Sequence, residues 1–175
     1  EYSLAVILEI DENRKVYYYT RAVWNENLHA AEKLDFVTDF HRRLYDREAA
    51  REITKYLETN SRLEDNSSFH KVNIHSSFRQ ITWGDLNVTE VVEPSYQLRE
   101  IASQTASFLV DYVVATSDGK ETTYYLAEEY YRVRYSTDRM YLLDYERTMT
   151  QIPDTESMYG NDKIQLGITD PEVSM

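Results

Sequence analysis

The fold of this chain is decided by the stretch Gln104–Met149, which reads QTASFLVDYVVATSDGKETTYYLAEEYYRVRYSTDRMYLLDYERTM. In its first part large apolar residues recur at every second position, as a half-buried β-strand requires and as no helix does. The residues on that side are Ala106, Phe108, Val110, Tyr112 and Val114. The stretch therefore predicts extended chain with one face in a core.

Two short polar turns divide this stretch into three strands. Residues 117–120, SDGK, contain an Asp-Gly pair, and these residue types tolerate the positive φ angles of a type I′ hairpin turn. Residues 136–139, STDR, form the second turn. The runs 121–135 and 140–145 are long enough to pair with the strand before each turn. We therefore predict a meander of three long antiparallel strands.

The N-terminal residues predict a small hairpin. Residues 3–10 and 15–20 are rich in β-branched and aromatic side chains, and the polar residues 11–14 lie between them. An isolated hairpin is only marginally stable, so we expect this arm to pair with another chain or with the edge of the sheet.

Between residues 30 and 59 the apolar period becomes that of an amphipathic helix. The predicted buried stripe consists of Leu34, Val37, Phe40 and Leu44. Asp46 is a good N-cap, so the segment is either one kinked helix or two helices. The second stripe consists of Ala49, Ile53, Tyr56 and Leu57.

Weaker signals surround these elements. Residues 69–83 mix the strand and helix periods, and residues 86–92 predict a strand that ends at Pro94. Residues 96–101 predict either a further short strand or the start of the long one.

The chain as a whole divides into three parts. We predict an N-terminal β arm at residues 1–29 and an acidic, flexible tail at residues 150–175, where Pro and Gly occur without a period. Between them, residues 30–149 predict an α+β domain. Its curved antiparallel sheet of about four strands would wrap around the helix or helix pair like a cone.

The composition excludes several classes of function. Asp and Glu outnumber Lys and Arg by 31 to 19, and the net charge of −12 repels nucleic-acid phosphates and anionic lipid. The chain has no cysteine, no Gly-rich phosphate loop and no nucleophile elbow. We predict no cofactor and no metal, because the only grouping of possible ligands matches no standard metal spacing. That grouping is His70 and His75 with Glu64 and Asp65.

Two aspartates are candidates for catalysis. Asp111 and Asp144 each stand in an apolar strand, where a buried carboxylate could act as a general base in an apolar pocket. Inward-facing tyrosines such as Tyr112 and Tyr145 would line that pocket. The more ordinary arrangement is a pair of outward-facing, paired aspartates.

A second set of candidates would bind a partner protein. Tyr130, Arg132 and Arg134 share one side of a predicted strand, and the sixteen tyrosines of the chain suit wet interfaces as well as sheets. The alternative is an ordinary solvated sheet face.

A helix pair followed by a curved meander resembles the nuclear-transport-factor-two-like fold. A narrower resemblance is to the periplasmic domain of the inner-membrane assembly factor of type IV secretion and conjugation systems, including the TraK-type proteins. It covers residues 14–148 and is carried by three segments. These are the lead-in ENRKVY (12–17), the helix FVTDFHRRL (36–44) and the last strands YRVRYSTDRMYLLDY (131–145).

The resemblance implies a non-enzymatic scaffold that binds copies of itself and other secretion-channel proteins at the periplasmic face of the inner membrane. Its contact with the membrane would be through an anchor removed from this sequence. The competing hypothesis is a cone-fold enzyme or ligand-binding protein, and a phage or extracellular structural module is a third. An open apolar cavity would favour the enzyme, and a filled interior would favour the scaffold.

Overall fold

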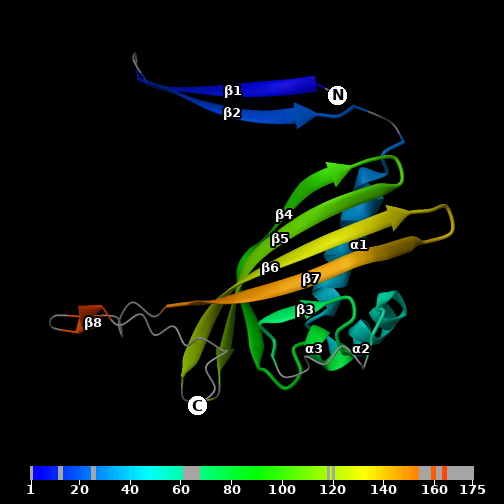
Figure 1. The fold of residues 1–175 in the computed structure, drawn as a ribbon, viewed down its shortest axis with the longest axis vertical. Coiled ribbons are helices and arrows are strands. Elements are labelled where there is room, and N and C mark those ends of the chain that lie inside the picture. Colours follow the sequence, from blue (N-terminus) through cyan, green and yellow to red (C-terminus); the bar gives the residue numbers. More distant parts are fainter. Residues whose placement is uncertain are drawn as a thin grey trace.

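The chain has an α+β fold, which confirms the predicted class (Figure 1). The structure is a computed structural model that describes residues 2–11, 14–24, 27–60, 68–117, 119, 121–153, 159–160 and 163–164. In chain order the elements are β1 (Tyr2–Asp11), β2 (Arg14–Ala22), α1 (Ala30–Arg43), α2 (Arg47–Ala50), the 3₁₀ helix η1 (Arg51–Tyr56), β3 (Lys71–Asn73), α3 (Phe78–Ile81), β4 (Val88–Ile101), β5 (Thr105–Ser117), β6 (Thr122–Tyr135), β7 (Met140–Ile152), β8 (Tyr159–Gly160) and β9 (Lys163–Ile164).

The main sheet has the strand order β3-β7-β6-β5-β4, and all neighbouring strands are antiparallel. The predicted meander forms its centre, since β6 pairs with β5 on one side and with β7 on the other. The sheet has five strands rather than about four, because the short β3 from the mixed stretch 69–83 adds to the edge of β7. Residues 118 and 120 of the predicted hairpin turn lie outside the described residues.

One strand boundary corrects the sequence analysis. The sequence predicts a strand that ends at Pro94, but β4 continues through it to Ile101. Proline is tolerated there because β4 is an edge strand, where a missing N–H on the outer side breaks no ladder bond. The pairing with β5 skips from Val92 to Ser95 at this point, which is a local bulge.

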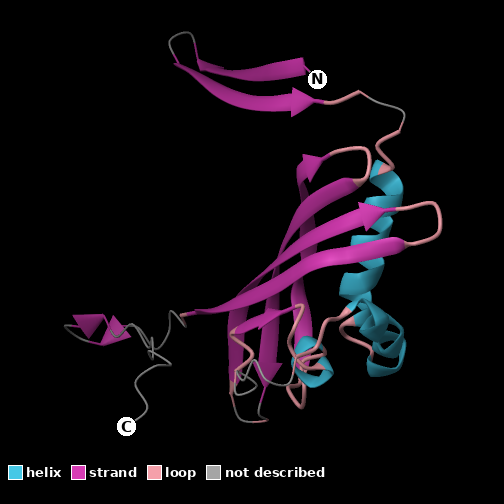
Figure 2. Cartoon of the chain, turned by 45° about the vertical axis from the view of Figure 1, so that its right-hand side comes forward, coloured by secondary structure: helices cyan, strands magenta, loops and turns pink. Residues whose placement is uncertain are grey.

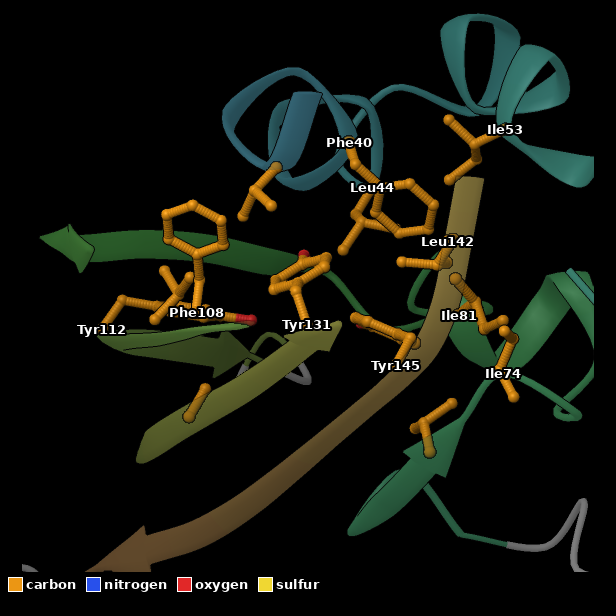
Figure 3. Close-up of a cluster of buried hydrophobic side chains, with 14 of the residues drawn as sticks. Phe40, Leu44, Ile53, Ile74, Ile81, Phe108, Tyr112, Tyr131, Leu142 and Tyr145 are labelled. Carbon is orange, nitrogen blue, oxygen red and sulfur yellow. The ribbon is translucent and has the colours of Figure 1, made fainter. Parts of the chain in front are cut away.

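α1 packs against one face of the sheet, which we call the inner face (Figure 3). Val37, Phe40 and Leu44 are buried, as the helical period predicts. The ring centroid of Phe40 lies 5.7 Å from that of Tyr131 on β6 and 5.4 Å from that of Tyr145 on β7. The helix is therefore held by aromatic packing on the two central strands.

Leu34 is the exception in the predicted stripe. Its side chain is 37% exposed, and its neighbour Lys33 is buried in its place. The Lys33 ammonium donates to the carbonyls of Leu28 and Ala102 at 2.7 Å and to that of Ser103 at 3.0 Å. Burial lowers the pKa of Lys33. These bonds tie the start of α1 to the turn between β4 and β5.

The segment after α1 forms separate helices rather than one kinked helix. Asp46 caps α2 as predicted, since its carboxylate accepts from two backbone N–H groups of α2 at 2.9 Å and 3.2 Å. η1 continues directly from α2. In the second predicted stripe Ile53 is buried, while Ala49, Tyr56 and Leu57 are half-buried.

β1 and β2 confirm the predicted N-terminal hairpin. They form a separate antiparallel sheet that runs from Tyr2 opposite Ala22 to Asp11 opposite Arg14. Figure 1 and Figure 2 show this arm standing apart from the main sheet, next to the end of β4. There the Arg21 guanidinium donates to the backbone carbonyl of Arg99 on β4, at 3.4 Å.

Most of the predicted tail at residues 150–175 lies outside the described residues. Within it β7 extends to Ile152, and β8 pairs with β9. In the described parts of the chain no helix is both long enough and apolar enough to cross a membrane.

We expect Phe40→Asp to unfold the domain, because it places a charge in the contact between α1 and the sheet. The free energy of unfolding in urea should fall by more than about 4 kcal/mol. Leu34→Asp on the same helix is the matched control, and since Leu34 is 37% exposed, it should lower that free energy by only about 1–2 kcal/mol. Equal effects of the two variants would contradict the assignment of the buried face of α1.

Candidate functional site

A single carboxylate is buried at the centre of the inner face. Glu129 on β6 is fully buried, whereas the neighbouring Glu128 is exposed on the opposite, outer face of the sheet. The alternation of a strand explains the difference, since Glu129 shares its side of β6 with the buried Ala127 and Tyr131.

Four hydrogen-bond donors surround the Glu129 carboxylate. Oε1 accepts from the hydroxyls of Tyr112 and Tyr145, each at 3.0 Å. Oε2 accepts from the hydroxyl of Tyr131 and from Nδ1 of His41, each at 2.7 Å. A carboxylate offers about four lone-pair sites, so these donors fill them. The donors come from α1, β5, β6 and β7.

His41 connects Glu129 to a second carboxylate. Its Nε2 lies 3.2 Å from the carboxylate of Glu90 on β4. Burial acts to lower the pKa of His41, but its hydrogen bonds to Glu129 and Glu90 and the charges of both raise that pKa above the ordinary 6.5. Only the protonated ring donates from both nitrogens, so His41 is an imidazolium between two carboxylates.

Arg147 on β7 is the second buried cation. Its guanidinium donates to the carbonyls of Ile81 at 3.0 Å and Gln80 at 2.9 Å, and it lies 3.5 Å from the ring centroid of Trp83. One of its nitrogens is 4.0 Å from Glu129. With two cations and two carboxylates, the network has no net charge.

The protonation states follow from these contacts. Burial acts to raise the pKa of Glu129, but the hydrogen bond from His41 and the charges of His41 and Arg147 outweigh it, and the pKa lies below its ordinary value. Burial and the charge of Glu129 raise the pKa of each of the three tyrosines. Glu129 is therefore ionised and its acceptor sites are occupied, so it has no free lone pair for a substrate proton.

The His41 end of this network meets a hollow in the surface. The hollow has a volume of about 430 Å³ and is lined by His41, Arg42, Tyr45, Glu90, Glu93, Pro94 and Tyr96. Most of these side chains are charged or aromatic with a polar end. The hollow is thus unlike the enclosed apolar cavity that a cone-fold enzyme requires.

Asp111 and Asp144 lie on the outer face, which corrects the hypothesis that they line an interior pocket. Asp111 is half-buried and accepts from Nε2 of Gln97 at 2.7 Å, and Asp144 is exposed. Tyr112 and Tyr145 are buried on the inner face, as expected. Each aspartate directly precedes one of these tyrosines in a strand, so both members of a pair cannot face inward.

Tyr130, Arg132 and Arg134 lie on the outer face of β6. Arg132 and Arg134 are exposed and Tyr130 is half-buried. Arg132 lies opposite Asp144 in the strand register, and the Arg134 guanidinium lies 4.5 Å from the ring centroid of Tyr141. The three residues are available to a partner, in a mixed-charge part of the sheet.

The histidines of the possible metal grouping make separate backbone contacts. Nδ1 of His70 lies 2.6 Å from the carbonyl of Met149, and Nδ1 of His75 lies 3.1 Å from that of Glu58. Among the described residues no three His, Asp or Glu side chains are grouped closely enough to hold a metal ion. Glu64 and Asp65 lie outside that part of the chain.

The arm is the second candidate site, because its two faces differ. One face, which we call the arm face, has four uncharged rows, and the ion pair of Asp11 and Arg14 follows them on the same side at the turn end. It consists of Tyr2, Leu4, Val6, Leu8, Val16, Tyr18, Thr20 and Ala22. The other face includes Glu9, Lys15 and Arg21. Every residue of β1 is exposed, so no described part of the chain covers the arm face.

Comparison of the chain with protein-family models, with curated proteins and with solved structures found no match. The geometry of these two sites is therefore the basis for a functional interpretation.

We expect Glu129→Gln to lower the free energy of unfolding by about 3–5 kcal/mol, because it leaves two buried cations without their shared carboxylate. Glu128→Gln, one residue earlier on the exposed face, is the control and should cost about 0.5 kcal/mol or less. Urea unfolding of both variants measures the difference. A small effect of Glu129→Gln would mean that the carboxylate is not ionised in the folded state.

The raised pKa of His41 gives stability a defined pH dependence. The stabilisation from His41 is complete below its unfolded pKa of 6.5 and is lost as the pH rises through the higher folded pKa. The free energy of unfolding should therefore fall as the pH rises from about 6.5 through the folded pKa of His41. In the His41→Gln variant, the decrease in the free energy of unfolding over this pH interval should be absent. Urea unfolding of both proteins over a pH series tests this, and parallel curves would contradict an imidazolium at His41.

Proposed function

We propose that this chain is a non-enzymatic assembly domain that acts through self-association and contacts with other proteins. One observation carries the proposal, namely the uncharged arm face that no described part of the chain covers. An apolar surface of this kind on a two-stranded hairpin is unfavourable in water unless a partner covers it.

The interior supports a structural role over a catalytic one. The inner face holds packed aromatic side chains, and the acceptor sites of its buried carboxylate are filled by donors from the same chain (Figure 3). A general base needs a free lone pair within reach of a substrate. Glu129 lacks one, and Asp111 and Asp144 lie on the other side of the sheet.

We further propose that the sheet wraps around α1 in the cone-like manner of nuclear-transport-factor-two-like proteins. The support is the order of elements, with helices before four long antiparallel strands, and the packing of Phe40 against Tyr131 and Tyr145. Fold alone does not set function, so this likeness adds to the proposal without carrying it.

The assembly that we propose is a type IV secretion or conjugation channel, at the periplasmic face of the inner membrane. This part rests on the resemblance of residues 14–148 to the assembly factors of such channels. An arm that stands apart from its domain and a charged outer sheet face with Tyr130, Arg132 and Arg134 are compatible with contacts to several proteins at once.

Sedimentation of the chain over a range of concentrations tests self-association, and we expect it to associate as the concentration rises. Leu8→Ser on the arm face should raise the dissociation constant about fivefold, since about half a leucine side chain, or about 1 kcal/mol, is newly buried on association. Leu8 and Ile7 are each 49% exposed, so Ile7→Ser on the opposite face is the matched control. A chain that is monomeric at all concentrations would contradict the proposal.

A further inference from the structure

We propose that the arm face of one copy packs on an apolar patch of the next copy, so that copies join head to tail. This inference rests on the proposed function, because it names the partner of the arm. The patch lies on the outer face of the main sheet, at the end where β4 begins. It consists of Val92, Val113, Ala115, Tyr124, Leu126 and Ile152.

The strand register brings these residues together. Val92 lies opposite Val113, and Val113 lies opposite Leu126 in one row across β4, β5 and β6. In the next row Ala115, Tyr124 and Ile152 are opposite one another across β5, β6 and β7. Val92, Leu126, Tyr124 and Ile152 are each at least 39% exposed. The outer face thus has an apolar end, separate from its charged end.

The arm and the patch of one copy lie at opposite ends of the sheet. The hydrogen bond from Arg21 to Arg99 holds the base of the arm beside the end of β4 (Figure 1). Val92 lies opposite Val113, and the neighbours of Arg99 lie opposite Phe108 and Ser107, so the two points are about 17–20 Å apart along β5. In the structure the arm and the patch of one copy thus lie apart (Figure 1), and we infer that they meet between different copies.

The two surfaces match in size. The arm face has four rows of two residues, about 20 Å by 5 Å between side-chain positions, and the patch has two rows across four strands, about 7 Å by 14 Å. The arm face offers eight positions, and the two rows of the patch also have eight, six of them the apolar residues named above and two of them Thr89 and Thr150. An arm laid across the strands therefore covers the patch. Packing of two arms against each other would leave both patches in water. The head-to-tail contact covers both apolar surfaces at once.

Charge sets the direction of the arm on the patch. The row next to the patch carries Asp111 opposite Glu128. β2 carries three basic residues and no acidic one, whereas β1 carries two acidic residues and no basic one. The arm therefore lies with β2 toward the acidic row. Residues 2–24 contain three acids and three bases, so this contact brings a neutral segment onto residues 25–175, which hold a net charge of −11.

The size of the contact predicts its affinity, and its geometry predicts how many such contacts each copy makes. It covers on the order of 100 Å² of each partner between side-chain positions, well below the roughly 800 Å² per partner of a stable complex. A single contact is therefore weak. The contact is heterologous, so each copy can use its arm on one neighbour and its patch on another. In a closed ring every copy then makes two such contacts.

Cross-linking with a short thiol-specific reagent tests this geometry, and the absence of native cysteine makes the result specific. Val6→Cys places a thiol on the arm face, and Leu126→Cys places one in the patch. A mixture of these two full-length variants should give a cross-linked heterodimer, while each variant alone should give little product. The control is a mixture of Ile7→Cys, on the other face of the arm, with Leu126→Cys. This mixture should give much less cross-linked heterodimer.

The outcomes separate this inference from the proposed function. Cross-linking of Val6→Cys with itself would show arm-to-arm pairing, which overturns the head-to-tail contact but leaves self-association intact. Loss of the heterodimer together with monomeric sedimentation at all concentrations would overturn both. A double variant with Val6→Cys and Leu126→Cys should form a ladder or a closed ring, and a product that stops at a dimer would also overturn the inference.

Discussion

The main domain depends on one buried charge, the carboxylate of Glu129. An ionised carboxylate in the interior is very costly unless donors surround it, and here the donors come from α1 and all three strands of the meander. A slip of β6 by one residue would move Glu129 and Tyr131 to the outer face and leave two tyrosine hydroxyls and an imidazolium inside without their acceptor. The charge therefore specifies the register of the sheet and the position of α1 together.

The same network reaches the periphery of the domain through its two cations. His41 extends it to Glu90 on the edge strand β4, and Arg147 extends it to backbone carbonyls of α3, next to Trp83. Trp83 has a φ of 66°, an unfavourable value for a bulky residue. Stacking of its ring on the Arg147 guanidinium offsets part of this strain. The edge strand and the short helix are thus positioned by one central carboxylate.

Much of the sheet could be predicted from sequence, but its polar centre could not. Period-two alternation is sufficient for the meander and for the buried Tyr112 and Tyr145. Glu129 was overlooked, although it shares the parity of Ala127 and Tyr131, because a pattern analysis treats charged residues as exposed. The burial of Lys33 does not follow from the helical period for the same reason. Their burial depends on donors and carbonyls that are distant in sequence, such as Tyr145 or Ala102.

The arm face can be predicted from the sequence, but the surface that would cover it cannot. Its alternation is local, so the hairpin and its uncharged face follow from residues 2–22. The surface that would cover it is not local, because the patch is assembled from β4, β5, β6 and β7. The interior of the domain has no spare hydrogen-bonding capacity at its one buried carboxylate, whereas the arm has an apolar face without a partner. These two properties support the proposal that this chain acts through contacts between copies.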